Sequence, residues 1–247
     1  MSQFNHVVRF VKRPDGKPTP DVFKIEKERI RQLNSGEYLL RNAYLSMDPA
    51  LVGRMRDEDN YVEKVSPGEV MQAYGIGQVI ESNNPQVKVG SVRLGRIDMQ
   101  QYSIFSDAQE CKEINLGLAT ASTYLGAMGI NGSTAYFAIN EICKPKAGET
   151  FLVSAGGSAV GSVAAQIAKN MGCKTVGIVS TDEKTKAIVR DYGFDAAVSY
   201  RGKTVDELSR DIKEVCPQGV DVYFDNTSGD ISEAVLDTLN ENARVAV

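Results

Sequence analysis

The chain has 247 residues, 42% of them hydrophobic and 24% charged, the balance of a globular protein large enough for two small domains. Its 28 Lys and Arg residues against 32 Asp and Glu leave a net charge of −4, and no apolar stretch is long enough to span a membrane, so we expect neither nucleic-acid nor membrane partners. One histidine, His6, and four cysteines without a C-x-x-C pair nearly exclude His-ligated zinc, and we expect no metal. Because the N-terminus lacks the apolar core of a signal peptide, we also expect reduced thiols and a cytoplasmic location.

The first half of the chain is predicted to be β-rich. Short apolar runs alternate with turn sequences that contain Pro, Gly, Asn or Asp. The runs span residues 6–11, 37–45, 73–80 and 101–105. Glycines such as Gly75 and Gly77 permit the bends that a small curled barrel needs. This spacing favours a compact antiparallel barrel over parallel βαβ units.

Two short helices are expected next, at residues 118–128 and 133–142, and from residue 150 strands and helices alternate. The predicted strands are residues 150–154, 175–180, 196–199, 220–224 and 244–247, and the predicted helices are residues 162–171, 182–192, 205–215 and 231–239. Apolar strands that alternate with amphipathic helices are typical of a parallel sheet in a doubly wound α/β fold. We place the boundary near residue 120, with one domain at residues 1–120 and a second at 121–247.

The end of the sequence falls inside an apolar run, residues 243–247. A nucleotide-binding sheet of this type usually continues for at least one more strand. We therefore expect the second domain to be truncated within or after its fifth strand. The alternative is a complete protein that ends on an edge strand.

The most informative motif is VSAGGSAVG at residues 153–161, which follows an apolar strand and precedes an apolar helix. Small residues such as Gly157 let the backbone of such a turn approach a dinucleotide pyrophosphate, and the helix N-terminus favours its negative charge. Gly161 would let the helix pack closely on the strand. The strict G-x-G-x-x-G spelling is absent, so a plain strand–turn–helix remains the alternative interpretation.

The following strand indicates which dinucleotide is bound. NAD-binding proteins carry an Asp or Glu at the tip of this strand, but here it ends in Ser180 and Thr181, with Asp182 close by. Lys184 follows at the start of the next helix, where a cation suits a 2′-phosphate, so NADP(H) is favoured over NAD(H). For Lys186 we favour a solvated helix face.

These motifs resemble the zinc-free branch of the medium-chain dehydrogenase/reductases that contains the leukotriene/prostaglandin reductases, the 2-alkenal reductases and the curcumin-type reductases. The resemblance rests on an ordered set of segments. They are YLSMDP at residues 44–49, GRM at 53–55, GSTAYF at 132–137, KPKAGET at 144–150, the fingerprint region, GCKTVGI at 172–178, DEK at 182–184, GFDAA at 193–197 and DVYFDN at 221–226. The resemblance implies a GroES-like β-barrel domain, which supplies substrate-binding and catalytic groups, followed by a Rossmann domain.

The resemblance also implies the roles of individual residues. Ser158, Ala159, Val160 and Gly161 would contact the pyrophosphate, Lys184 the 2′-phosphate and Tyr200 the adenosine-phosphate pocket, while Asn226 would hold the cofactor and Thr134 would lie near the nicotinamide. Tyr200 as a packing residue, Asn226 as a turn residue and Thr134 as a helix N-terminal residue are alternatives that the sequence leaves open. Ser158 stands where the family usually has a glycine, and we expect it to crowd the phosphate turn. The family's active-site tyrosine motif would lie beyond Val247, so no catalytic residue is assigned.

The activity that the resemblance implies is hydride transfer from NADPH to the C=C bond of an α,β-unsaturated ketone or aldehyde, with hydrogen bonds to the developing enolate oxygen. A non-catalytic NADPH-binding or regulatory relative is one alternative. Quinone reduction within the same superfamily is another. The expected partner is a small enone or enal, and a homodimer is left open.

Overall fold

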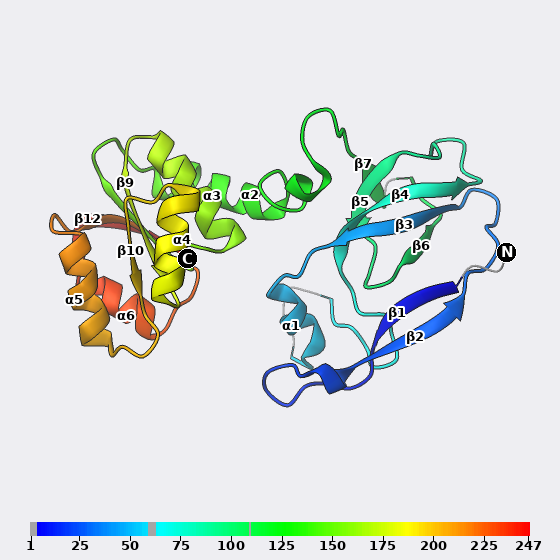
Figure 1. Cartoon of the computed structure of the whole chain (residues 1–247), viewed down its shortest axis with the longest axis horizontal. Coiled ribbons are helices and arrows are strands. Elements are labelled where there is room, and N and C mark those ends of the chain that lie inside the picture. The colour runs from blue at the N-terminus through cyan, green and yellow to red at the C-terminus, as the bar shows by residue number, and fades with distance from the viewer. Residues whose placement is uncertain (1–3, 59–62, 109) are drawn as a thin grey trace. The chain divides into compact units, whose positions relative to one another are not determined.

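The computed structural model describes residues 4–58, 63–108 and 110–247. The chain forms two compact units, Met1–Leu125 and Gly126–Val247, each with its own buried clusters of apolar side chains (Figure 1). No described helix is both long enough and apolar enough to cross a lipid bilayer.

The N-terminal unit is built from antiparallel sheets, as the turn-rich first half of the sequence predicts. Strands β1 (Phe4–Phe10) and β2 (Phe23–Arg29) form a two-stranded sheet in which β1 buries Val7 and Phe10. A second sheet has the order β6-β3-β4-β5-β7. Its strands are β3 (Tyr38–Leu45), β4 (Tyr74–Ser82), β5 (Val92–Arg96), β6 (Tyr102–Phe105) and β7 (Cys111–Glu113).

Several elements of this unit differ from the sequence-based prediction. Strands β2, β5 and β7 and the helix α1 (Ala50–Met55) are not predicted, and a 3-10 helix, Pro20–Val22, precedes β2. The helix expected at residues 118–128 is wrong, because only a 3-10 helix forms there, Ala121–Tyr124. The hydroxyl of Thr120 lies 2.8 Å from that of Thr123, and such short-range side-chain bonds compete with helix formation.

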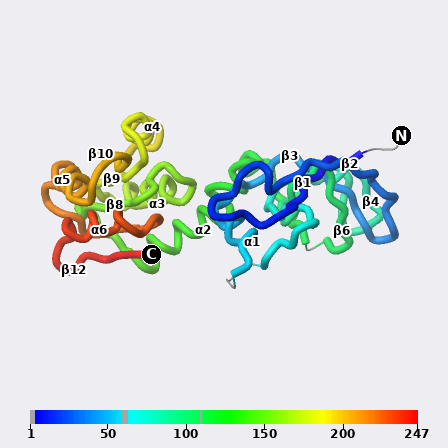
Figure 2. Tube along the Cα trace, turned by 90° about the horizontal axis from the view of Figure 1, so that it is seen from below, coloured from blue at the N-terminus to red at the C-terminus, as the bar shows by residue number. Residues whose placement is uncertain are grey.

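The C-terminal unit contains the predicted parallel sheet, and its strand order is β10-β9-β8-β11-β12. The strands are β8 (Thr150–Ser154), β9 (Lys174–Val179), β10 (Ala196–Ser199), β11 (Val220–Phe224) and β12 (Leu239–Ala246). In Figure 2, β12 runs along one edge of the sheet, with β10 at the other. The first strand of this sheet, β8, therefore lies at its centre. The chain then extends the sheet to one side through β9 and β10, and returns to add β11 and β12 on the other side.

Helices cover both faces of this sheet. They are α2 (Ile130–Phe137), α3 (Ala159–Asn170), α4 (Asp182–Tyr192), α5 (Val205–Val215) and α6 (Asp230–Leu236). Side chains of α2, α3 and α4 share one buried cluster with the strands, and side chains of α5 and α6 share a second. Helices on both faces of a parallel sheet define a doubly wound fold and confirm the predicted fold class.

The bounds of several predicted elements are corrected. The helix expected at residues 162–171 is α3, which begins three residues earlier, at Ala159. The helix expected at residues 133–142 is α2, which continues as a π-helix over Ala138–Cys143. The helix expected at residues 231–239 ends at Leu236, and the strand expected at 244–247 begins five residues earlier, at Leu239. Strand β12 pairs with β11 at Leu239 and again over Arg244–Ala246, with a register shift between the two.

Candidate functional site

The turn between β8 and α3 has the tight geometry that the small-residue motif predicts. The residues of β8 are all buried, and Ala155 then takes a left-handed conformation with φ of +51°. The backbone N–H of Gly156 donates to the carbonyl of Ile178 on the neighbouring strand β9 (3.0 Å). A Cβ atom on Gly161 would lie 2.5 Å from the carbonyl oxygen of Ala155, so only glycine allows this approach of α3 to β8. The fingerprint therefore combines a strand end, a sharp turn and a closely packed helix.

Ser158 is the N-cap residue of helix α3. Its backbone has φ of −77° and ψ of 168°, a conformation that does not require glycine, and its hydroxyl oxygen accepts a hydrogen bond from Gly161 N–H (3.0 Å). Gly157, Ser158 and Ala159 are exposed, while Val160 is half-buried and Gly161 is buried. Because the first N–H groups of a helix have no partner within it, an anion can approach this exposed turn.

The tip of β9 carries the residues that indicate the type of dinucleotide. The hydroxyl of Thr181 caps α4 by accepting from the backbone N–H of Lys184 (3.3 Å). The side chains of Lys184 and Lys186 are both exposed. Two acids, Asp182 and Glu183, lie in the first turn of α4, and the carboxylate of Asp182 accepts a hydrogen bond from Ser199 at the end of β10. A cation and helix N–H groups thus lie where a 2′-phosphate is expected.

Tyr200 directly follows β10. Its backbone N–H donates to the carbonyl of Val179 at the end of β9 (3.0 Å), which joins the two strand ends. Its half-buried side chain packs against the cluster formed with α5 and α6. The structure therefore brings Tyr200 to the same sheet edge as Lys184, with part of its side chain in a packing role.

Asn226 follows β11, at the carboxyl end of the strand beside β8. Its backbone N–H donates to the hydroxyl of Ser154 (2.7 Å), and its side-chain Nδ2 donates to the carbonyl of Ser154 (3.2 Å). These two bonds connect the end of β11 to the residue that opens the phosphate turn. Ligands of doubly wound sheets bind at this edge, where the strand order reverses.

Thr134 lies at the fifth position of α2, rather than at the helix N-terminus. Its side chain is exposed, and its hydroxyl donates to the carbonyl of Ile130 in the same helix (2.8 Å). Helix α2 packs against α3. The hydrogen bond of Thr134 thus stays within its own helix and does not reach the phosphate turn.

The sequence analysis does not predict a group of polar side chains at the carboxyl edge of the parallel sheet. The group is formed by Ser154, Asp225 and Ser232. Ser154 and Asp225 are 0% and 9% exposed, and the carboxylate of Asp225 accepts hydrogen bonds from both serines. The signal in the sequence is a polar residue at the end of each of two apolar strands. Their contact depends on β8 and β11 being neighbours, which the sequence alone does not state.

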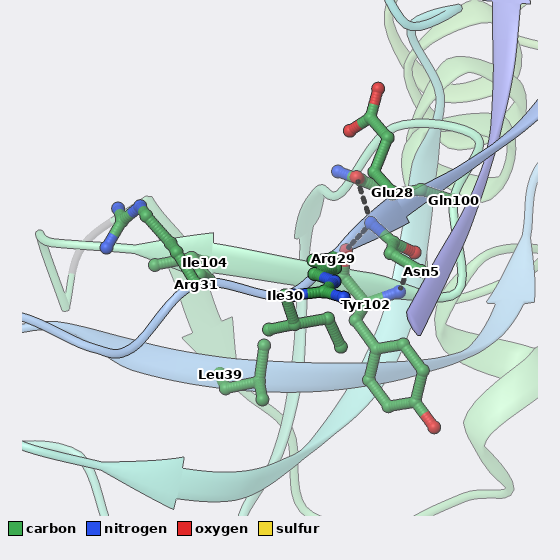
Figure 3. A pocket seen from close by; sticks show the side chains of 9 residues that line it. All are labelled: Asn5, Glu28, Arg29, Ile30, Arg31, Leu39, Gln100, Tyr102 and Ile104. Carbon is green, nitrogen blue, oxygen red and sulfur yellow. Dashed lines mark hydrogen bonds between the residues drawn. The ribbon is translucent and has the colours of Figure 1, made fainter. Parts of the chain in front are cut away.

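A surface hollow of about 340 Å³ in the N-terminal unit contains none of the predicted cofactor residues (Figure 3). Several of its polar lining groups are already bonded: Asn5 donates to Gln100 (3.0 Å), and Arg31 forms an ion pair with Glu37. Among residues 4–58, 63–108 and 110–247, no three His, Cys, Asp or Glu side chains converge as metal ligands would.

Two family models match the chain. One, described as the N-terminal domain of oxidoreductase, matches residues 6–114, and the other, described as zinc-binding dehydrogenase, matches residues 159–247. Together they cover parts of both units.

Curated relatives match nearly the whole chain. The NADPH-dependent curcumin reductase of Escherichia coli (strain K12) is 36% identical over 235 residues, which cover 95% of this chain and 67% of that protein. The NADP(+)-dependent 2-alkenal reductase of Nicotiana tabacum is 38% identical over 86% of this chain and 62% of its own length. Prostaglandin reductase 1 of Sus scrofa is 36% identical over 94% of this chain and 68% of its own length.

The solved structure of CurA from Vibrio vulnificus in complex with NADPH is similar in fold and sequence. It has a TM-score of 0.89 and 36% identity, over 97% of this chain and 70% of that one. Together with the doubly wound sheet and its small-residue turn, these matches establish the family. The chain belongs to the medium-chain dehydrogenase/reductase superfamily, in the branch of the curcumin, 2-alkenal and prostaglandin reductases.

Proposed function

We propose that the protein is an NADPH-dependent oxidoreductase that reduces the C=C bond of α,β-unsaturated ketones and aldehydes. The observation that carries the proposal is the phosphate turn at Ser158–Gly161 beside the exposed Lys184, in a chain 36% identical to an NADPH-dependent curcumin reductase and to CurA, whose structure contains NADPH. When bound, NADPH supplies the hydride, and the protein binds and orients it.

The cofactor site in this proposal lies along the carboxyl edge of the parallel sheet. The turn that contains Gly157, Ser158, Ala159, Val160 and Gly161, the first three of them exposed, faces the pyrophosphate, and Lys184 and Tyr200 face the 2′-phosphate end. Asn226 holds the other half of the cofactor, and Thr134 lies near the nicotinamide. The N-terminal unit is proposed to supply the substrate-binding and catalytic groups.

The proposed reaction does not use zinc. The described residues offer no convergent set of zinc ligands, and each of the four free cysteines is buried. Desolvation raises the pKa of Cys111, Cys143 and Cys216 to about 11, which keeps these thiols protonated at neutral pH. Free thiols also suit the reducing cytoplasm, where we propose that the protein acts on small enones and enals.

Cofactor titration tests the binding step. We expect the purified chain to bind NADPH more tightly than NADH, because Lys184 can form a charge-assisted hydrogen bond with the 2′-phosphate. Lys184→Ala should weaken NADPH binding about tenfold and leave NADH binding unchanged. Lys186→Ala, which removes an exposed lysine from the same helix, is the matched control and should bind both nucleotides like the wild type. Equal NADPH affinity of the Lys184→Ala variant and the wild type would refute the assignment.

Turnover tests the reaction. NADPH oxidation that depends on a simple α,β-unsaturated ketone, with formation of the saturated ketone, is the expected result. NADPH binding without turnover would instead support a non-catalytic relative, and a preference for quinones would support a quinone reductase. Light scattering of the same sample determines whether the protein is a homodimer.

A further inference from the structure

The turn after β11 is organised around one buried carboxylate. Oδ1 of Asp225 accepts hydrogen bonds from the backbone N–H groups of Thr227 (3.0 Å) and Ser228 (2.9 Å) and from the hydroxyl of Ser154 (3.3 Å), while Oδ2 accepts from Ser232. Burial alone would raise the pKa of Asp225, but the bonds from Ser232, Ser228 and Thr227 outweigh it and hold this pKa below its usual range. The carboxylate therefore joins the end of β8, the turn and helix α6.

The same network fixes the position of the Asn226 side chain. The Ser154 hydroxyl donates to Asp225 and accepts from the backbone N–H of Asn226 (2.7 Å). Nδ2 of Asn226 donates one of its two hydrogens to the Ser154 carbonyl (3.2 Å), which leaves the side-chain carbonyl oxygen Oδ1 and the second N–H for a ligand. An acceptor oxygen suits a hydroxyl or an amide N–H and does not suit a phosphate.

The strand order places Asn226 opposite the residues for the 2′-phosphate. Strand β8 lies between β9 and β11, so Lys184, which follows β9, and Asn226, which follows β11, lie on opposite sides of the phosphate turn. A dinucleotide with its 2′-phosphate at Lys184 and its pyrophosphate at the turn would extend its nicotinamide half toward Asn226. That half carries ribose hydroxyls and a carboxamide N–H, the donors that Oδ1 of Asn226 requires.

We propose that Asp225 is a positioning residue for the nicotinamide half of the cofactor. Through Ser154 and the turn after β11, it holds Asn226 so that its carbonyl oxygen accepts a hydrogen bond from a ribose hydroxyl or the carboxamide. Asp225 does not itself touch the cofactor. This inference rests on the proposed function, since it requires that the protein bind NADPH.

Two nucleotides separate this role from a general structural one. NADPH contains the nicotinamide half, whereas adenosine 2′,5′-bisphosphate contains only the adenosine end. Asp225→Ala should weaken NADPH binding about three- to tenfold, the loss of one hydrogen bond, and leave the affinity for the bisphosphate unchanged. Asn226→Ala should do the same, and the double variant should bind NADPH no more weakly than either single variant. An NADPH analogue that lacks the carboxamide N–H would show whether Asn226 binds the carboxamide or a ribose hydroxyl.

The chain offers a matched control on the same strand. Asp221, at the other end of β11, accepts hydrogen bonds from the backbone N–H of Thr150 (2.8 Å) and from Asn240 (2.8 Å). Asp221→Ala should lower the stability of the sheet but leave the affinities for both nucleotides unchanged. Asp225→Asn keeps an acceptor for the turn N–H groups and should restore most of the NADPH affinity.

The outcomes distinguish the inference from the function on which it rests. If the wild type binds neither nucleotide, the proposed function fails and the inference fails with it. If the wild type binds NADPH and Asp225→Ala binds it equally well, or loses affinity for both nucleotides alike, only the inference fails. Should Asp225→Ala not fold, Ser232→Ala, which removes one bond to the carboxylate, must weaken NADPH selectively for the inference to stand.

Discussion

Ser158 occupies a position where a glycine is common in dinucleotide-binding turns. Its φ of −77° lies in the region open to all residues, and its hydroxyl accepts from Gly161 N–H as an N-cap. The sequence predicts that Ser158 crowds the turn, whereas in the structure its hydroxyl caps α3. The hydroxyl hydrogen of Ser158 can still be donated to a phosphate.

The capping role of Ser158 predicts the effect of replacing it. Ser158→Ala should lower the free energy of unfolding by about 1 kcal/mol. Ser158→Gly also removes the acceptor of the Gly161 N–H but should cost only about a few tenths of a kcal/mol, because glycine is itself favoured at the N-cap position. Urea unfolding curves followed by circular dichroism measure both. A Gly variant that is less stable than the Ala variant would contradict this role.

At the scale of elements, the contact of α3 with β8 and β9 determines the shape of the phosphate turn. A Cβ on Gly161 would meet the backbone of Ala155, and a Cβ on Gly177 of β9 would lie 2.5 Å from Ile188 Cδ1 of α4. Both glycines therefore allow helices to pack closely against the sheet. Gly157 differs, because its Cβ would lie 3.3 Å from a methyl group of Ile188, which can move.

These contacts predict different results for two neighbouring glycines. Gly161→Ala should lower the free energy of unfolding by about 1 to 3 kcal/mol, since the clash is with backbone atoms, and it should weaken NADPH binding by displacing the turn. Gly157→Ala should change stability by less than about 1 kcal/mol, because its neighbour is a side-chain methyl group. Thermal unfolding with and without NADPH measures both effects, and equal stabilities would show that α3 can shift away from β8.

At the scale of the whole molecule, Asp98 responds to acid in the opposite way to the carboxylates whose pKa values are lowered. In the N-terminal unit, burial raises the pKa of Asp98 to about 6, although Arg96 lies 3.8 Å away, and its buried Oδ1 has no hydrogen-bond partner among the residues described. In the C-terminal unit, hydrogen bonds hold the pKa values of Glu149, Asp195 and Asp225 below their usual range despite burial.

The raised pKa of Asp98 predicts an unusual pH dependence for the N-terminal unit. A carboxyl whose pKa is higher in the folded state stabilises that state below its unfolded pKa, and this stability is lost as the pH rises through about 6. Protonation of Asp98 should therefore contribute about 2 kcal/mol between about pH 7 and about pH 4, a gain that is partly offset by Glu37 and Asp21, whose pKa values are held at about 2. Amide hydrogen exchange of its strands, corrected for the intrinsic rate, measures the gain.

The control for this pH dependence is Asp98→Asn, which cannot ionise and should remove most of the gain. The C-terminal unit should show little change over the same range, because its lowered pKa values place its loss of stability at more acidic pH. A similar pH profile for the variant and the wild type would show that another group is responsible.

Several elements could be predicted to the residue from local sequence signals. The bounds of α4, β10, α5 and β11 agree with the sequence-based ranges. Helix α5 begins at a capping box between Thr204 and Glu207, and α4 ends before Gly193, which adopts a left-handed conformation. The residue types that form these two signals can be read from the sequence. Strand β2 was missed because its sequence, FKIEKER, is mostly polar and is stabilised by pairing with β1.

The sequence by itself determined the doubly wound sheet, the phosphate turn and the lysine beside it, because each depends on residues that are close along the chain. The tertiary structure decided how strand ends meet: that Ser199 binds Asp182, and that Ser154 and Asp225 together orient Asn226. These contacts join residues 17 to 72 positions apart. Local periodicity carries no information on such pairs, since they form only once the strand order brings β8 beside β11 and β9 beside β10.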